Sequence, residues 1–530
     1  MNIKQIAQNS FYQLLVIYAV IVILIAVGIF HKFSLQFHIL AIILGIIGIA
    51  VLPDSVSTEK TKNKKLHYAI LIIAIIFLTT ARIIPYLDSQ IPLGYDAGIY
   101  KYGIEHGLEN KDFWILSGGM EPGFLYLMEI FKIFFSSQTI LTWLFVAFNV
   151  LLGISIYLFT KEFISEEAAL FSVVIFALSL VQFKTFSYMY YKNVVGLCFM
   201  LFALLFLKKY EKSSNKYFLA AFVILGGILL AIHRPTFYIF GLTYFFYTFI
   251  VPYKEKIYST KKLKVYFLAG VLILAIGILF YLGDFLSALT AILPFVAEGF
   301  VSPGESPGTF ISFFQYQYST LFYLPIALVG LFYFIRKKQF NFVVIWAIIN
   351  LATVYFQFFF FNRFIIHLDI ALIILAGAGF TVLKQKGKWL QFVIALLLIA
   401  GAVMAIKESL NAEPLISRQT LNSIENLNKT LSSNAKLLVI SSEYSPWIMG
   451  YSGLEGKNII APGLFDENSW SQEEWNRFWS TADAEETKQL MSAYSSENQE
   501  IYLFAGTKTF NNSCFTVYSD NGGKVYKYAC

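Results

Sequence analysis

Apolar segments of about 20 residues recur along this chain and constrain its fold more than any other feature. The first begins at Phe11 and the last ends near Ala405. Lipid offers the backbone no hydrogen-bonding partners, so each segment is expected to cross the bilayer as a helix. The composition agrees, because 57% of the residues are hydrophobic and 14% are charged, against roughly 25% charged in soluble proteins. We therefore predict an integral membrane protein of mainly α class.

The hydropathy pattern predicts a polytopic helical bundle of about 13 transmembrane helices. The predicted spans are residues 11–30, 36–52, 67–85, 138–159, 167–183, 192–207, 217–232, 236–252, 265–282, 319–335, 341–360, 364–382 and 389–406. Residues 122–135 are expected to form an amphipathic helix on the outer surface instead. A crossing there would move every later lysine-rich loop to the opposite side of the membrane.

Lysine-rich loops fall on one alternating side of the predicted bundle. They are residues 60–65, 208–216, 254–264, 336–338 and 384–388. Because such loops mark the cytoplasmic side, the N-terminus is predicted inside and the C-terminus outside, in the plasma membrane. The net charge of +7 is then explained by topology, and we predict no nucleic-acid partner.

The chain is predicted to divide into three parts. Residues 1–66 hold two transmembrane helices and a cytoplasmic loop, residues 67–406 form a transmembrane module, and residues 407–530 form a small α/β domain outside the membrane. The module carries two long outer loops, 85–121 and 283–318. In the last part, strands are predicted at 435–441, 458–461 and from 500 onward, and helices at 417–431 and 471–494.

A hairpin near the C-terminus tests this topology. Two predicted strands flank a turn at 521–523, and a loop of three residues sets Asp520 opposite Lys524. The same register sets Cys514 opposite Cys530, and a disulfide there fits an oxidising outer compartment. The alternative is two unrelated free thiols.

Ionisable residues gather at the predicted outer ends of the spans, where such groups usually mark a function. The first outer loop contains Asp96, between glycines and aromatic residues, and ends at Glu121. A carboxylate at this position suits a general base for a hydroxyl, or a metal ligand. The alternatives are a solvated loop aspartate at Asp96 and, at Glu121 before Pro122, an ordinary helix start.

Cations are predicted in the same outer plane. They are Lys184, Lys192, His233, Arg234, Arg363 and His367. Arginine forks are suited to phosphate. The alternatives are snorkelling of the two lysines to lipid headgroups and a structural pairing of Arg363 and His367 with Asp369. The second outer loop, which carries Glu305, has the length and turn residues of a lid over a site, or of a plain surface loop.

This arrangement resembles the GT-C superfamily of polytopic membrane glycosyltransferases, in particular protein O-mannosyltransferases and aminoarabinose transferases. The similar features are an outer loop with Asp96 and Tyr100, a helix that opens with Glu121-Pro122, and a late helix that begins at Arg363. The resemblance implies a GT-C-like bundle. It also implies transfer of a sugar from a polyprenyl-phosphate-linked donor to a glycan, lipid or protein acceptor outside the cytoplasm, with inversion.

For such a reaction, the leading hypothesis assigns roles to individual residues. Asp96 would be the base and Glu121 would orient the sugar. Substrate and phosphate would be bound by Tyr100, Lys101, His106, Lys184, Lys192, His233, Arg234, Glu305, Arg363 and His367. A divalent metal, Mg²⁺ or Mn²⁺, is left open with Asp96 as its candidate ligand, since the family often has a second acidic residue where this chain has Ala97.

Two other functions fit the same sequence. A transporter or flippase of lipid-linked sugars would use the outer loops as a gate, although transporters more often show internal repeats and broken helices. A membrane scaffold without catalytic activity would use its C-terminal domain to bind partners.

Overall fold

The computed structural model describes residues 64–107, 120–255, 260–282, 311–356, 361–384, 388–432, 435–454, 456–462, 470–494 and 499–530. The predicted spans 11–30 and 36–52 and the candidate residue Glu305 lie outside these residues. The chain divides into two compact units, which are described separately. Unit 1 comprises Met1–Pro85, Glu121–Phe124 and Phe145–Asn411, and unit 2 comprises Tyr86–Met120, Leu125–Leu144 and Ala412–Cys530.

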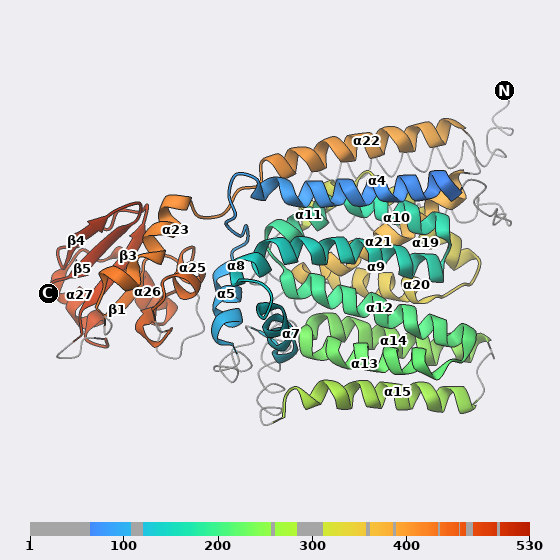
Figure 1. Cartoon of the computed structure of the whole chain (residues 1–530), viewed down its shortest axis with the longest axis horizontal. Helices are drawn as coiled ribbons and strands as arrows, with labels where there is room; N and C mark the ends of the chain where they lie inside the picture. Colours follow the sequence, from blue (N-terminus) through green and yellow to red (C-terminus); the bar gives the residue numbers. More distant parts are fainter. Residues whose placement is uncertain are drawn as a thin grey trace. The chain divides into compact units, whose positions relative to one another are not determined.

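The described secondary-structure elements of unit 1 are all helices (Figure 1). Its helices are α4 (Lys64–Ile83), α9 (Phe145–Phe163), α10 (Glu166–Leu178), α11 (Leu180–Ser187), α12 (Tyr191–Ser213), α13 (Lys216–Ile232), α14 (Arg234–Glu255), α15 (Thr260–Leu279), α18 (Phe313–Thr320), α19 (Leu324–Arg336), α20 (Phe342–Tyr355), α21 (Phe361–Leu383) and α22 (Lys388–Leu410). The short helix α7 (Pro122–Lys132) begins in unit 1 and continues in unit 2.

Several of these helices are long and apolar enough to cross a membrane. Within the described residues there are five, or six if one bent pair of helices counts as a single span. They confirm a mainly helical membrane protein, while the total of about 13 spans stays a prediction.

The predicted span 167–183 is not one straight helix. The structure breaks it into α10 and α11, which meet at an angle of 54°. Ser179 lies at the break with extended backbone angles, and its hydroxyl accepts a hydrogen bond from the backbone N–H of Gln182. A serine in this position is an N-cap, so it starts a new helix where the apolar pattern predicted a continuous one.

Helix α21 forms the centre of unit 1, and 89% of its apolar 18-residue stretch is buried. It crosses α19 at very short range, because Gly330 and Gly379 lie in the contact. A Cβ atom added to Gly379 would lie 1.9 Å from the carbonyl oxygen of Ile326. Only glycine allows the two backbones to approach this closely.

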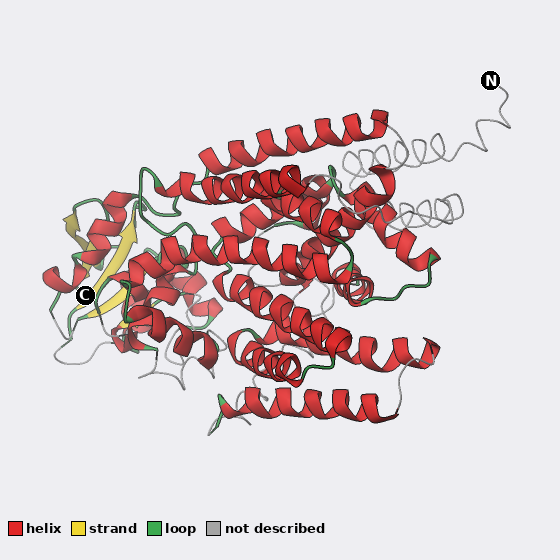
Figure 2. Ribbon diagram, turned by 45° about the vertical axis from the view of Figure 1, so that its right-hand side comes forward, coloured by secondary structure: helices red, strands yellow, loops and turns green. Residues whose placement is uncertain are grey.

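Unit 2 combines short helices with one sheet, whose strands are yellow in Figure 2. The helices are α5 (Ala97–His106), α8 (Ser137–Thr139), the π-helical turn η2 (Ile140–Leu144), α23 (Arg418–Glu425), α24 (Leu427–Thr430), α25 (Ser445–Tyr451), α26 (Gln472–Ser480) and α27 (Ala484–Met491). The strands are β1 (Lys436–Val439), β2 (Ile459–Ile460), β3 (Ile501–Gly506), β4 (Phe515–Asp520) and β5 (Lys524–Tyr528).

The sheet has the strand order β2-β1-β3-β5-β4. Strands β2, β1 and β3 are parallel, and β5 and β4 are antiparallel additions at one edge. This confirms the predicted small α/β arrangement after the membrane helices. The helix α25 was not predicted, because its residues Ser445–Tyr451 are largely apolar and lack a polar face.

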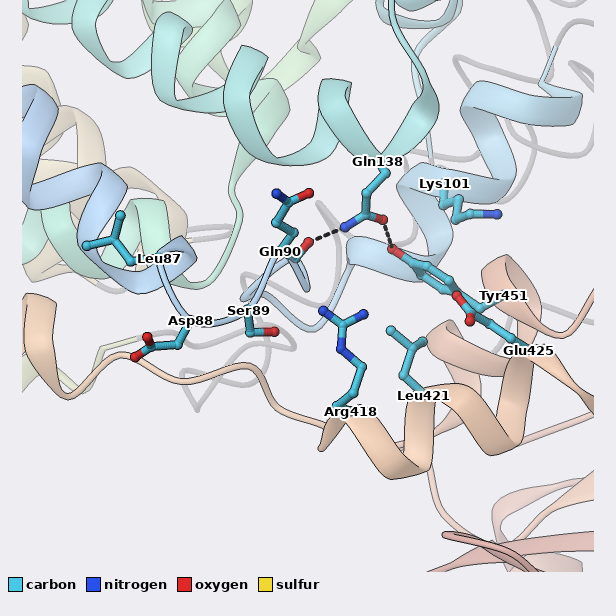
Figure 3. A pocket seen from close by; sticks show the side chains of 10 residues that line it. All are labelled: Leu87, Asp88, Ser89, Gln90, Lys101, Gln138, Arg418, Leu421, Glu425 and Tyr451. Atoms are coloured by element: carbon cyan, nitrogen blue, oxygen red, sulfur yellow. Dashed lines mark hydrogen bonds between the residues drawn. The ribbon is translucent and has the colours of Figure 1, made fainter.

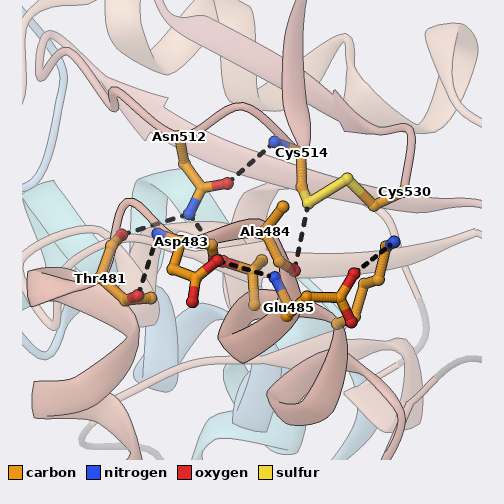
Figure 4. The surroundings of a disulfide bond; sticks show 9 residues. Thr481, Asp483, Ala484, Glu485, Asn512, Cys514 and Cys530 are labelled. Atoms are coloured by element: carbon orange, nitrogen blue, oxygen red, sulfur yellow. Dashed lines mark hydrogen bonds and ion pairs between the residues drawn. A yellow bond between two sulfur atoms is a disulfide. The ribbon is translucent and has the colours of Figure 1, made fainter.

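The β4–β5 hairpin pairs Asp520 with Lys524 at its turn, as predicted. A register shift between Val517 and Ser519 moves the far end by one residue. The carbonyl of Cys514 therefore accepts a hydrogen bond from the N–H of Ala529. A disulfide joins Cys514 to Cys530 beside this pair (Figure 4), and Cys198 is a buried free thiol in α12.

Candidate active site

A buried carboxylate in unit 1 is held by two cations. The Lys192 Nζ lies 2.8 Å from one carboxylate oxygen of Glu121, and the Arg234 Nε lies 3.8 Å from the other. The backbone N–H of Arg234 also donates to Glu121 at 3.4 Å. Glu121 is 3% exposed, and the two cations are 12% and 11% exposed. The structure thus brings three predicted site residues together.

Each of these residues stands at the start of a helix. Glu121 precedes Pro122, the first residue of α7, while Lys192 and Arg234 lie in the first turns of α12 and α14. Proline favours a helix start, and the positive helix N-termini stabilise a nearby anion. One carboxylate faces two cations and three helix starts, so the local charge is positive. The site around Glu121 can therefore bind a second anion such as a phosphate.

Arg363 adds a further positive charge to this cluster. It lies in the first turn of α21, and its charge acts on both Lys192 and His233. Cations from α12, α14 and α21 therefore gather around one place in unit 1. We call Glu121, Lys192, Arg234 and Arg363 the Glu121 charge cluster.

The two histidines among the predicted site residues are connected by hydrogen bonds through a threonine, which the sequence analysis did not identify. The His233 Nδ1 lies 2.7 Å from the Thr236 hydroxyl, and that hydroxyl lies 3.1 Å from the His367 Nε2. All three side chains are buried. The bonds link the start of α14 to α21, so the histidines fix the helix that carries Arg234.

A second buried carboxylate, Asp369, is held by uncharged groups. It accepts hydrogen bonds from the Tyr323 hydroxyl, from Ser179 at 3.0 Å and from Gln182 at 2.8 Å. The sequence missed these partners, although two of them are polar residues inside a predicted apolar span. His367 bonds to Thr236 rather than to Asp369.

Arg82 is a further candidate that sequence reasoning missed. It is fully buried near the end of α4, and its guanidinium lies 4.9 Å and 5.3 Å from the ring centroids of Phe183 and Phe186. Within the described residues, none of its three side-chain nitrogens has a hydrogen-bond partner. The signal in the sequence is a single arginine near the end of an apolar span.

The remaining residues of the first outer loop belong to unit 2. Asp96 is half-buried at the N-cap of α5, and Tyr100 is buried one turn later. Burial raises the pKa of Tyr95 to about 12, and the charge of Asp96 adds to the rise. The Tyr95 hydroxyl donates a hydrogen bond to the Ser442 carbonyl at 2.8 Å. The loop aspartate thus lies beside a tyrosine that stays protonated at neutral pH.

Lys101 and His106 lie further along α5. The Lys101 Nζ donates to Glu105 at 2.8 Å and to the Gly450 carbonyl at 2.9 Å. The His106 ring centroid lies 4.9 Å from that of Tyr102. Lys101 therefore connects α5 to the C-terminal part of unit 2.

Lys184 is half-buried on α11 and makes no side-chain hydrogen bond or ion pair with another described residue. Among those residues there is also no group of three or more His, Cys, Asp or Glu side chains that could hold a metal ion. Glu121 is already engaged by cations, which is the wrong environment for a metal ligand. Asp96 as a metal ligand stays a prediction.

Comparisons with known proteins concern the family and the fold. Residues 121–281 match the family described as dolichyl-phosphate-mannose-protein mannosyltransferase. This segment contains Glu121, Lys192, His233 and Arg234. None of the curated proteins matches the chain.

Two solved structures show how far the fold is shared. The oligosaccharyltransferase AglB of Archaeoglobus fulgidus, in complex with an inhibitory peptide and a dolichol-phosphate, has a TM-score of 0.56 at 14% identity, over 84% of this chain and 69% of its own. ArnT of Cupriavidus metallidurans, bound to undecaprenyl phosphate, has a TM-score of 0.56 at 13% identity, over 87% and 97%. The matched family segment and the shared fold together confirm that this integral membrane protein resembles the GT-C glycosyltransferases.

Proposed function

We propose that the chain is a glycosyltransferase that moves a sugar from a polyprenyl-phosphate-linked donor to an acceptor on the outer face of the membrane. The observation that carries the proposal is the Glu121 charge cluster, in which Lys192 and Arg234 engage Glu121 and the charge of Arg363 acts on Lys192. The family segment begins at the same glutamate. Structural neighbours bound to dolichol-phosphate or undecaprenyl phosphate support a lipid phosphate as the donor's leaving group.

In the proposed reaction the acceptor oxygen attacks the anomeric carbon while the bond from this carbon to the phosphate oxygen breaks. The acceptor proton passes to the carboxylate of Asp96, and the polyprenyl phosphate leaves with one additional negative charge. Lys192, Arg234 and Arg363 would bind the phosphate more strongly as this charge develops. Glu121 would orient the sugar hydroxyls, and a single displacement inverts the anomeric centre.

The topology that accompanies this function is also proposed. Some 13 helices would span the plasma membrane, with the N-terminus in the cytoplasm. Residues 1–66 would precede the transmembrane module of 67–406, and residues 407–530 would lie outside. The lysine-rich loops and the disulfide between Cys514 and Cys530 support this orientation.

The test is transfer by the purified full-length protein in proteoliposomes that contain radiolabelled polyprenyl-phosphate hexoses. We expect the label to appear on acceptors or, without an acceptor, as free sugar formed by slow hydrolysis. A donor that stays intact with every hexose would overturn the proposal. Asp96→Asn is expected to lose transfer and to keep donor binding, whereas full transfer by this variant would remove Asp96 as the base.

One observation favours a second candidate, a flippase of lipid-linked sugars. Transporters often contain broken helices next to a buried ionisable residue, and the break at Ser179 lies against Asp369. The same proteoliposomes separate the two functions. Movement of labelled lipid between leaflets without sugar transfer would favour the flippase, and neither activity would favour a scaffold.

A further inference from the structure

Unit 2 contains a polar pocket with a volume of about 520 Å³ (Figure 3). Its walls come from the chain segment after η1 (Ile84–Tyr86) and from the helices α5, α8, α23 and α25. Sites for small ligands have volumes of roughly 300–1,000 Å³. The pocket is therefore large enough for a small molecule or for the end of a longer one.

One wall of the pocket is fixed before any ligand binds. The Tyr451 hydroxyl donates to the side-chain oxygen of Gln138 at 3.3 Å, and the Gln138 amide donates to the Gln90 carbonyl (Figure 3). The Lys101 Nζ lies 4.8 Å from the Tyr451 ring centroid and donates to the Gly450 carbonyl. Side chains held in this way lose little entropy on binding.

Three charged residues of the lining offer groups that are not engaged. Asp88, Arg418 and Glu425 are exposed, and with the described residues their side chains make no hydrogen bond or ion pair. Their donors and acceptors are thus available to a ligand. Together with Lys101 they place two acidic and two basic groups around the pocket, so the lining carries no net formal charge.

These properties favour one chemical class of ligand. An acyl chain needs apolar walls, and a phosphate needs an excess of cations. None of the lining residues belongs to a strand, so the pocket cannot hold an extended peptide by adding it to a sheet edge. A neutral saccharide presents many hydroxyl groups that both donate and accept, and it matches a lining of amides, carboxylates and cations.

The pocket is rigidly connected to the candidate base. Asp96 occupies the N-cap position of α5, and Lys101 lies five residues later, about 8 Å along the helix axis. Helix α5 touches α25 at Gly98 and Gly450, where a Cβ atom added to Gly98 would lie 1.7 Å from the Pro446 carbonyl oxygen. Because no side chain separates the two helices, the pocket and Asp96 belong to one body.

We propose that this pocket binds the acceptor and that the acceptor is a neutral saccharide. The role of this saccharide as a substrate rests on the proposed transferase function. The C-terminal domain then contributes α23 and α25 to acceptor recognition, and α5 carries both a wall of the pocket and the base.

The test is equilibrium binding of fluorescently labelled neutral disaccharides (maltose, cellobiose, lactose and mannobiose) to the full-length protein in nanodiscs. We expect saturable binding of at least one of them, weakened about tenfold by Arg418→Ala through lost charge-assisted hydrogen bonds. Arg418 is exposed and unengaged, so this variant is expected to fold. The matched control is Arg477→Ala, since Arg477 is an exposed arginine of α26 that pairs with Glu486 outside the pocket.

Two results would overturn the proposal. One is that no disaccharide binds, including the case in which a labelled peptide binds instead and Arg418→Ala abolishes that binding. The other is that disaccharide binding survives Arg418→Ala. Donor hydrolysis by water, measured without acceptor, keeps this test separate from the proposed function. If donor is hydrolysed and no disaccharide binds, the acceptor site is wrong and the transferase stands. If disaccharides bind and donor is never cleaved, the pocket stands and the transferase is wrong.

Discussion

Two buried carboxylates of unit 1 have opposite surroundings. Glu121 is held by Lys192 and Arg234, which are charged and stand at helix starts. Asp369 is held by the hydroxyl and amide groups of Ser179, Gln182 and Tyr323. Glu121 therefore lies among surplus cations, whereas Asp369 lies among neutral donors. This difference indicates that Glu121, and not Asp369, belongs to a binding site.

The physical consequence differs at the two places. A phosphate can replace Glu121 as the partner of the cations, because these stay charged and retain donors for a new anion. A phosphate cannot replace Asp369 in the same way, because the donors bound to Asp369 are neutral. These partners come from α11 and from the residue before α19. We infer that Asp369 fastens the broken helix α10–α11 to α21, and that Glu121 holds cations ready for the donor.

The largest expected effect follows from removing a cation of the Glu121 charge cluster. Lys192→Met is expected to lower kcat/KM for sugar transfer about 100- to 1,000-fold, as when a group that stabilises transition-state charge is lost. The matched control is Lys208→Met, because Lys208 lies on the same helix α12 and pairs with Glu211. Transfer at the wild-type rate by Lys192→Met would contradict the comparison.

A double variant separates loss of charge from loss of stability. Removing one partner of a buried ion pair destabilises a protein, so Glu121→Gln is added to Lys192→Met. The thermal midpoint is expected to recover relative to Lys192→Met, whereas transfer is not. Recovery of both would mean that Lys192 acts only through stability.

The second effect concerns the other carboxylate. Asp369→Ala leaves three buried donors without their acceptor and is expected to destabilise the folded state by about 3 kcal/mol or more. Thermal unfolding in detergent measures this loss. Donor affinity of the folded fraction is expected to stay within about threefold of wild type, and a large loss of affinity at full stability would place Asp369 in the binding site instead.

A smaller effect is expected from deleting one donor to Asp369. Tyr323→Phe removes a single hydroxyl and is expected to cost about 1–2 kcal/mol of unfolding free energy. Tyr333→Phe is the control, since Tyr333 lies on α19 and its hydroxyl makes no bond with another described residue. Equal destabilisation by both variants would show that the Tyr323 hydroxyl does not support Asp369.

The smallest effect extends the comparison to Asp96 in unit 2. The pKa of Tyr95 is about 12 in the folded protein and about 10 in an unfolded chain. Folding thus favours the neutral hydroxyl, and this stabilisation is complete below pH 10 and is lost as the pH rises through 12. Thermal midpoints from pH 8 to 12 are expected to fall less for Tyr95→Phe than for wild type, and identical slopes would contradict the assignment.

Much of the fold follows from the sequence because apolar length and alternation are local signals. The strands β1, β3, β4 and β5 and the hairpin turn at Asp520 and Lys524 lie where the pattern predicts them. The break at Ser179 was missed, since one serine and one glutamine barely change the hydropathy of a span. The Ser179 hydroxyl caps α11 locally and also donates to Asp369, a tertiary contact that is distant in the sequence.

The sequence predicted which residues belong to the candidate site from their charge. It did not predict which side chains they contact. Charges at the ends of spans identified Glu121, Lys192 and Arg234, because lipid excludes charges elsewhere. Thr236, which joins His233 to His367, carries no charge and gives no such signal. Arg82 was visible as a charge, but its position over two phenylalanine rings needed the fold.

The most direct test of the central claim is equilibrium binding of undecaprenyl phosphate to the purified full-length protein. If the Glu121 charge cluster binds the lipid phosphate, saturable binding is expected for wild type and for Lys208→Met. It is expected to weaken about tenfold or more in Lys192→Met and in Arg234→Met, because each loses a charge-assisted contact. Equal affinity of all four proteins, or no binding by wild type, would contradict the account.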